Sequence, residues 1–530
     1  MNPRAPLGTR AIFDGLLISA FVLALAYPSL DPFLRPNAER TALVEFRNPA
    51  PLPHHPHSLD EWIAYPQAFE SFFGDHFGLR DKLVRWHNLA DWYLFGVSPT
   101  PKLVLGDGAW IYYDDDKSLE VYRGAYPFSA RELEGWRHLL TARRNWLAER
   151  GIRYLFVFVP NKDQVYPQHL PARYARRGAT RLDQLLEHMR AHSDVDVLDL
   201  RPALVAETAH DAPEDYVFHR LGTHWTDRGA YAGYVAIVEE LRRIFPVLAP
   251  LPRSSFKVEE TGDGDSWAAH LYMDDLLRQK NFRWTLESPH AVFDAAAVDG
   301  AEQFQSDRDD PRLPRVLVLH DSFGPPLRPF MAENFAHAMW SWGWSFDARI
   351  ELIEAEKPDI VIELFVDRVL VQDYPQVSSA LEPGVAERAF DASKEVVARF
   401  DSTNLSSTIV PYGQTKFVPT PNRTDGFLVV RTERGTDGVL IPAVPFPADA
   451  DVIVAVDVDS YMETGIDLFF RTRSEATFER RRVFNETLKL GRNHVYFRLC
   501  GGDLAGPMFL HFRNPKVYRL RSIEIRAVRD

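Results

Sequence analysis

Through much of the first two thirds of the chain, continuous apolar runs alternate with segments in which apolar residues recur at helical spacing. Near-continuous apolar runs at 154–159 and 315–319 are typical of strands inside a sheet that is covered on both faces. Elsewhere apolar residues recur every three or four positions, which predicts helices at 131–149, 181–192, 228–244 and 326–335. Strands that alternate with helices indicate an α/β fold with a mostly parallel sheet and helices on both of its faces.

The pattern changes after about residue 385. Helical spacing disappears, and short alternating runs follow one another between Gly, Asn, Asp and Pro turns. Alternation with a period of two is the pattern of strands that bury one face. We therefore expect an all-β sandwich of about seven or eight strands over 385–530.

The N-terminus holds a mostly apolar run at 11–30, preceded by two arginines. About twenty residues that rise about 1.5 Å each reach roughly 30 Å, enough to span a bilayer. The basic flank favours a cytoplasmic N-terminus and an exported remainder. We expect an uncleaved anchor at 1–35 in the inner membrane and a body in the periplasm. A signal peptide cleaved near Ala-Leu-Ala at 24–26 is the alternative, and Pro28 makes that cleavage site less attractive.

A segment rich in Pro and His at 36–60 predicts a linker that leads into an α/β domain at 61–380. Three histidines in this segment offer a metal site as the alternative, but no carboxylate or cysteine nearby completes it. We expect no metal and no cofactor.

Charge and cysteine content narrow the classes of function. A formal net charge of -13 argues against a nucleic-acid partner, which would require a basic face. Cys500 is the one cysteine, which excludes an intrachain disulfide and a cysteine-based zinc site.

Two segments supply a nucleophile and a base. Ser322 follows the strand predicted at 315–319 and precedes the helix predicted near Pro325, so its hydroxyl is expected at the C-terminal end of a strand. The backbone N–H groups of that helix could hold a developing oxyanion. His224 precedes the helix predicted at 228–244 and is the expected base, with a structural histidine as the alternative.

A second serine competes with Ser322. Ser266 stands in Gly-Asp-Ser at 264–266, the form that esterases of the SGNH class carry at their nucleophile. It follows a polar loop and has no strand behind it. We therefore rank Ser322 above Ser266.

Several segments together resemble the alginate O-acetyltransferase family (AlgX and AlgJ), whose catalytic domain is SGNH-hydrolase-like. The resemblance covers roughly 60–370, with the histidine before the serine. The segments that carry it are Phe-Glu-Ser-Phe-Phe-Gly-Asp-His-Phe-Gly-Leu-Arg at 69–80, Pro-Asn-Lys-Asp-Gln-Val-Tyr-Pro at 160–167, Thr-His-Trp at 223–225, His-Asp-Ser-Phe at 320–323 and Pro-Asp-Ile-Val-Ile-Glu at 358–363. The C-terminal sandwich looks like the carbohydrate-binding module of AlgX-type members.

The resemblance implies a Ser–His–Asp triad with Ser322 and His224 as its first two members. The acid, two positions before the histidine, falls on Gly222. Three explanations remain open. A carbonyl or another acid, such as Asp215 or Asp227, orients the histidine; the enzyme runs as a slow Ser–His dyad; or the domain only binds its ligand. In the serine-protease template, loss of the acid costs roughly 10⁴ in kcat.

Substrate-binding residues are expected at the same edge of the sheet. Lys162 and Tyr166 follow the strand at 154–159, and the lysine could meet a uronate carboxylate; a pair that stabilises the turn is the alternative. Trp225, beside the expected base, is placed with them. The alternating tryptophans at 340–344 could stack on sugar rings, although we expect them in the core.

The expected function is O-acetylation of an exported polysaccharide through an acetyl-serine. As the resemblance implies, a membrane partner would supply the acetyl group. An acetyl esterase is the alternative enzyme, and a non-catalytic polysaccharide-binding scaffold is the alternative from another class, because Gly222 replaces the acid.

Overall fold

The computed structural model describes most of the chain, namely residues 9–34, 49–78, 80–262, 264–294, 297–298, 301–372, 374–418, 426–433, 435–448, 450–472, 483–499 and 504–529. Much of the linker expected at 36–60 lies outside the described residues, as do the first eight residues of the expected anchor and Cys500.

A mixed sheet forms the centre of the α/β domain, in the order β4-β3-β12-β10-β11-β9-β7, with β8 beside β9. The five strands from β4 to β11 run parallel, while β9 and β7 are antiparallel. The prediction of a mostly parallel sheet is therefore confirmed. The strands are β3 (Arg153–Val159), β4 (Val197–Asp199), β7 (Val292–Asp294), β8 (Ala297–Val298), β9 (Ala301–Asp307), β10 (Arg315–His320), β11 (His337–Trp342) and β12 (Ile360–Val366).

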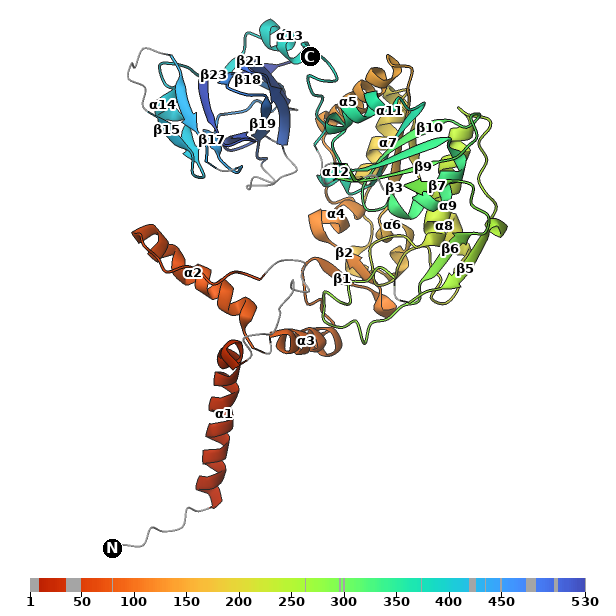
Figure 1. The fold of residues 1–530 in the computed structure, drawn as a ribbon, viewed down its shortest axis with the longest axis vertical. Helices are drawn as coiled ribbons and strands as arrows, with labels where there is room; N and C mark the ends of the chain where they lie inside the picture. Colours follow the sequence, from red (N-terminus) through yellow and green to blue (C-terminus); the bar gives the residue numbers. More distant parts are fainter. Residues whose placement is uncertain are drawn as a thin grey trace.

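Helices cover both faces of this sheet (Figure 1). Side chains of β3 alternate between the two faces: Phe156 and Phe158 belong to a core with α5 and α7, while Val157 and Val159 belong to a core with α8 and α9. Every β3 residue after Arg153 is buried, which is why this run reads as almost continuously apolar. The helices are α5 (Ala130–Ala148), α7 (Arg181–His192), α8 (Arg201–Glu207), α9 (Asp227–Arg242) and α11 (Ile350–Glu356).

The helix expected at 326–335 is broken. It consists of η8 (Pro325–Leu327), α10 (Arg328–Met331) and η9 (Ala332–Asn334), where η8 and η9 are 3₁₀ turns. Prolines at 325, 326 and 329 remove backbone donors and prevent one continuous helix. The sequence also gave no warning of a hairpin made by β5 (Phe256–Glu260) and β6 (Phe282–Leu286).

The C-terminal region is a β-sandwich whose two sheets have six and five strands among the described residues. The expectation of a sandwich is confirmed, with more strands than expected because several span only three or four residues. The first sheet contains β13 (Val396–Phe400), β15 (Lys416–Val418), β16 (Leu428–Arg431), β18 (Asp451–Ser460), β21 (Gly491–Leu499) and β23 (Val517–Val528); the second contains β14 (Val410–Tyr412), β17 (Gly438–Ile441), β19 (Thr464–Phe469), β20 (Val483–Leu488) and β22 (Met508–Phe512).

Polar contacts join the sandwich to the α/β domain. Arg131 of α5 pairs with Asp451 of β18 at 3.0 Å, and Arg498 of β21 pairs with the same carboxylate at 2.8 Å. A cavity of about 530 Å³ lies beside this junction and is lined by α5, by residues 375–387 and by strands of the sandwich.

Three helices precede the first strands: α1 (Thr9–Leu34) and α2 (Leu59–His76), which extend away from the α/β domain in Figure 1, and α3 (Arg80–Ala90), which lies against it and is followed by a π-turn, η1 (Asp91–Phe95). Within the part of the chain that the structure describes, no helix combines the length and the apolar character that crossing a membrane requires.

The remaining elements are short. They are β1 (Leu103–Leu105), η2 (Asp107–Ala109), β2 (Ile111–Tyr113), η3 (Asp115–Lys117), α4 (Ser118–Tyr122), α6 (Lys162–Val165), η4 (Pro167–His169), η5 (Ala172–Tyr174), η6 (Thr208–His210), η7 (Arg253–Ser255), η10 (Asp347–Arg349), α12 (Val369–Gln372), α13 (Val385–Ala392) and α14 (Leu405–Thr408).

Candidate active site

Ser322 lies at the carboxyl end of β10, in a turn that its neighbour holds in place. The two carboxylate oxygens of Asp321 accept backbone N–H groups from Phe323 and from Val366 at the end of β12, each at 2.8 Å. Asp321 therefore fastens the turn to the neighbouring strand, and Ser322 is left partly exposed. This is the strand–turn frame that the sequence predicted for the serine.

The loop before α9 presents His224, and an acid that the sequence analysis did not select holds it. Asp265 Oδ2 lies 2.9 Å from His224 Nδ1 and accepts the backbone N–H groups of Thr223 at 2.7 Å and His224 at 2.9 Å. Thr226 then caps α9 by accepting the N–H of Gly229, which fixes the start of the helix that follows the histidine.

Asp265 is an ionised partner for the histidine. Burial raises the pKa of Asp265, but the hydrogen bonds and positive charge of His224 outweigh that effect and hold this pKa well below its ordinary value. A carboxylate on Nδ1 fixes the ring orientation, and it leaves Nε2 as the nitrogen that can accept a proton. This pair has the geometry of the acid and base of a hydrolase triad.

The two acids suggested from the sequence lie elsewhere, which corrects that expectation. The Asp215 carboxylate is 3.7 Å from the Arg228 guanidinium. Asp227 accepts the backbone N–H of Trp284 at 3.0 Å. Neither is hydrogen-bonded to His224.

Gly222 makes room for Asp265. A Cβ atom at this glycine would lie 2.3 Å from both the backbone oxygen and Oδ2 of Asp265. The position where the family resemblance places the acid is therefore occupied by an acid from another segment, 41 residues after the histidine.

His224 lies beside the serine turn. Its ring centroid is 4.9 Å from that of Phe323, the residue after Ser322. His224 Nε2 is buried and has no hydrogen-bond partner among the described residues. The described residues form no hydrogen bond between Ser322 and His224. The hydrogen bond between a nucleophile and its base is often long before substrate binds.

Ser266 follows the acid directly but has a structural contact of its own. Its hydroxyl accepts the backbone N–H of Ala268 at 3.1 Å. The Gly-Asp-Ser segment thus brings its aspartate, and not its serine, into contact with His224.

Lys162 is buried, which corrects its expected role at a substrate carboxylate. Its Nζ donates to the carbonyls of His219 at 2.9 Å, Arg220 at 3.0 Å and Gly222 at 2.5 Å. Burial lowers the pKa of Lys162 to about 7. The lysine therefore supports the loop that carries His224.

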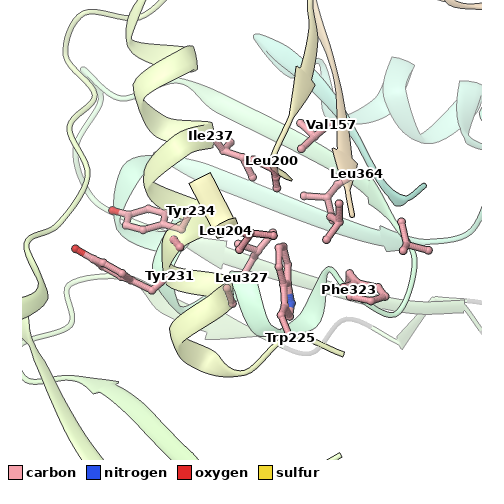
Figure 2. Close-up of a cluster of buried hydrophobic side chains, with 14 of the residues drawn as sticks. Val157, Leu200, Leu204, Trp225, Tyr231, Tyr234, Ile237, Phe323, Leu327 and Leu364 are labelled. Carbon is pink, nitrogen blue, oxygen red and sulfur yellow. The ribbon is translucent and has the colours of Figure 1, made fainter. Parts of the chain in front are cut away.

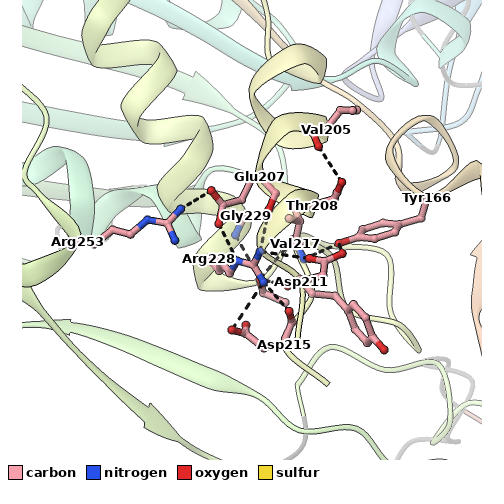
Figure 3. A network of polar contacts seen from close by, with 12 residues as sticks. Tyr166, Val205, Glu207, Thr208, Asp211, Asp215, Val217, Arg228, Gly229 and Arg253 are labelled. Atoms are coloured by element: carbon pink, nitrogen blue, oxygen red, sulfur yellow. Dashed lines mark hydrogen bonds and ion pairs between the residues drawn. The ribbon is translucent and has the colours of Figure 1, made fainter. Parts of the chain in front are cut away.

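Tyr166 is also buried and corrects the same expectation. Its hydroxyl accepts the backbone N–H of Val217 and donates to Asp211, each at 2.9 Å. Figure 3 shows this tyrosine at one end of a network centred on Arg228, whose Nε donates to Glu207 at 2.7 Å. The network holds the segment that leads from α8 to the histidine loop.

Trp225 belongs to the core, so its expected contact with substrate is wrong as well. It is 1% exposed, and its ring packs edge-on against Phe323 at 5.6 Å. Figure 2 shows the two rings together, below the side chains of Leu200 and Leu364. Trp340 is likewise buried, as the sequence analysis expected.

The described residues contain no ligand set for a metal ion. No group of three or more His, Cys, Asp or Glu side chains there is arranged to hold a metal ion. This includes the three histidines of the Pro- and His-rich segment, His54, His55 and His57, all of which the structure describes.

Residues 103–306 match the family model described as ALGX, an SGNH hydrolase-like domain of the acetyltransferase AlgX. The probable alginate O-acetylase AlgJ of Pseudomonas aeruginosa is 24% identical over 316 residues, which are 58% of this chain and 76% of that protein. This agrees with the resemblance read from the sequence.

Two solved structures share similarity with the chain. The O-acetyltransferase domain of Pseudomonas putida AlgJ is 19% identical, with a TM-score of 0.36, 52% of this chain covered and 94% of that one. Pseudomonas aeruginosa AlgX is 13% identical, with a TM-score of 0.38, 80% of this chain covered and 94% of that one. Because both TM-scores lie below 0.5, these likenesses carry no inference about the site. The match of residues 103–306 and the AlgJ relative show that this part of the chain is similar to the SGNH hydrolase-like acetyltransferases AlgX and AlgJ.

Proposed function

We propose that this protein O-acetylates an exported polysaccharide through an acetyl-serine at Ser322. One observation carries the proposal: the turn that carries the strand-end serine lies beside a histidine whose Nδ1 is 2.9 Å from an ionised aspartate, Asp265. An acid, a base and a hydroxyl at the carboxyl end of parallel strands are the groups that acyl transfer requires.

The reaction proceeds in two half-reactions. Ser322 Oγ attacks the carbonyl carbon of an acetyl donor while His224 Nε2 accepts the hydroxyl proton, and the donor departs with that proton. A sugar hydroxyl then loses its proton to His224 and attacks the acetyl-serine. The acetyl–Oγ bond breaks, and Ser322 Oγ takes that proton from His224, which restores the free serine. Asp265 stabilises the imidazolium that forms in each half-reaction.

The relatives named as alginate O-acetylases make a uronate polymer the first substrate to test. The C-terminal sandwich would hold the polysaccharide near the site. We further propose the inner-membrane anchor expected at 1–35, with the body in the periplasm and a membrane partner supplying acetyl groups.

The experiment measures acetyl release from 4-nitrophenyl acetate and acetyl transfer to oligouronates. Wild type is compared with Ser322→Ala, His224→Ala and Asp265→Ala, and Ser266→Ala is the matched control because it removes the neighbouring hydroxyl. We expect the first three variants to lose both activities and the control to keep them. Equal activity in Ser322→Ala and wild type would overturn the assignment of Ser322 as the nucleophile. Release without transfer to any sugar would favour the acetyl esterase.

A non-catalytic scaffold is the second candidate. The cavity of about 530 Å³ between the domains favours it, because Ser322, His224 and Asp265 do not line that cavity. Oligouronate binding that depends on Arg498 of the cavity wall, in a protein without acetyl transfer, would identify the scaffold.

A further inference from the structure

Arg368 lies at the same edge of the sheet as Ser322, two residues after the end of β12. Because β12 pairs with β10 on one side and with β3 on the other, this side chain starts between the two strands whose ends carry Ser322 and Asn161. Arg368 Nη1 donates to Asn161 Oδ1 at 2.7 Å and contacts Thr223 Oγ1 at 3.3 Å.

The guanidinium also packs on aromatic rings. Its central carbon is 5.9 Å from the ring centroid of Phe323 and 5.1 Å from that of Tyr113. Phe323 follows the serine and Thr223 precedes the histidine. The cation therefore contacts the immediate chain neighbours of both the nucleophile and the base.

This cation forms no direct ion pair in the described residues, although its charge acts on the nearby carboxyls of Asp321 and Asp367, where burial raises the pKa and the charge of Arg368 lowers it. Arg368 is 9% exposed, both of its hydrogen-bond acceptors are neutral oxygens, and no described carboxylate forms an ion pair with it. The adjacent Asp367 uses its carboxylate on the backbone N–H of Asn161 and on the Gln164 amide. Its direct contacts are therefore neutral, which leaves the guanidinium able to bind a negatively charged group at the edge of the sheet.

The backbone donors that follow Ser322 are used, which corrects the expectation that the following helix holds the oxyanion. The Phe323 N–H binds the Asp321 side chain, and the Gly324 N–H binds the Asp321 carbonyl at 3.0 Å. Pro325 and Pro326 have no N–H to offer. Acyl transfer still requires donors where negative charge develops.

We propose that the Arg368 guanidinium holds the acetyl carbonyl oxygen and stabilises the oxyanion, and is thus a catalytic residue. In this step the Oγ–C bond forms, the hydroxyl proton passes to His224, and the carbonyl π pair moves onto the oxygen beside Arg368. Collapse reforms the carbonyl and expels the donor alcohol, which takes the proton from His224. The inference rests on the proposed function, because it requires Ser322 to be the nucleophile.

The test compares Arg368→Met and Arg368→Lys in the full chain. Arg349→Met is the matched control, because Arg349 also binds neutral oxygens, Ser341 Oγ and the Trp342 carbonyl, near the end of a strand in the same sheet. Loss of one oxyanion donor lowers kcat by about 10²–10³-fold. We expect that loss in Arg368→Met with KM nearly unchanged, a smaller loss in Arg368→Lys, and no loss in the control.

Two further measurements separate stabilisation of the oxyanion from bracing of the loops. Guanidinium chloride, at concentrations that do not unfold the protein, should restore kcat in Arg368→Met. The inhibition constant of methylboronic acid, which forms a tetrahedral anion on a serine, should rise across the variants in proportion to the fall in kcat/KM. A boronate inhibition constant that stays the same across the variants while kcat/KM falls would overturn the proposal.

The outcomes also distinguish this inference from the proposed function. If Ser322→Ala is inactive while Arg368→Met keeps kcat within about threefold of wild type, only the role of Arg368 fails. If Ser322→Ala remains fully active, the proposed function fails first. Should Arg368→Met not fold, as judged by its melting temperature, Arg368→Lys and its boronate inhibition decide the matter.

Discussion

A Cβ atom at Gly222 would lie 2.3 Å from Oδ2 of Asp265, the oxygen that contacts the imidazole of His224. The missing acid and the acid that is present therefore compete for one space. What reads in the sequence as a defect of a triad is, in the folded chain, the opening through which a distant carboxylate reaches the histidine.

Asp265→Asn should lower kcat for acetyl release by about 10⁴-fold, the loss seen when the acid of a serine-protease triad becomes an amide. The amide no longer stabilises the imidazolium, and it permits the wrong tautomer. Steady-state kinetics with 4-nitrophenyl acetate measure the effect. Asp215→Asn and Asp227→Asn are controls that should keep kcat within about tenfold; a larger loss in either control than in Asp265→Asn would contradict the assignment.

Moving the acid from position 265 to position 222 should not restore activity. In the double variant Gly222→Asp with Asp265→Gly, the new Cβ still meets the backbone oxygen of residue 265, which is 2.3 Å from the ideal Cβ position. We expect no recovery of activity over Asp265→Gly alone, and a lower melting temperature. Recovery of kcat in the double variant would show that this loop adapts more readily than its packing indicates.

Lys162→Met should destabilise the protein and slow catalysis. The change leaves the carbonyls of His219 and Gly222 without their donor, whereas the Arg220 carbonyl keeps the backbone N–H of Ile111. Each buried acceptor without a partner costs about 1–3 kcal/mol. Thermal melts and kcat should both fall, whereas Lys102→Met, with its side chain 64% exposed, should change neither. An unchanged melting temperature in Lys162→Met would show that Lys162 does not support the loop that carries His224.

Acid should weaken the fold partly through His320. Burial lowers the pKa of this histidine from 6.5 to about 4. Between these values the unfolded chain gains a proton that the folded chain does not, so stability falls as the pH drops from 6.5 to 4, by at most about 3 kcal/mol for this group.

Melting temperatures of wild type and His320→Gln at pH 7.5 and pH 4.5 test this contribution. Replacement removes the titrating group, so the difference in melting temperature between the two proteins should narrow at the lower pH. The exposed His210 provides a control, since His210→Gln should leave the acid sensitivity of wild type in place.

The strands and the serine turn could be predicted because their signal is local. Buried parallel strands are almost wholly apolar, and Ser322 follows such a strand directly. The acid could not be predicted in this way. Asp265 lies in a polar loop, and its role depends on proximity to a residue 41 positions away. In the sequence, the Gly-Asp-Ser segment at 264–266 was considered only for Ser266 as a nucleophile.

The substrate-facing side chains were predicted wrongly for a different reason. A position after a strand indicates which edge of the sheet a residue occupies, but it does not indicate whether the side chain turns outward or inward. Lys162, Tyr166 and Trp225 all lie near the expected edge and all point into the protein. Arg368 was not selected from the sequence, because a charged residue after a strand looks like an ordinary surface position.

Under the proposed function, the 41-residue separation between His224 and Asp265 would also affect when the serine is reactive. Loops open locally at a lower free energy than the whole domain unfolds. An opening of the segment around Asp265 would remove the anchor of the histidine while the sheet stays intact, and Ser322 would then be an ordinary hydroxyl. Anything that loosens or clamps this one loop would therefore turn the chemistry off or on without altering the stability of the core.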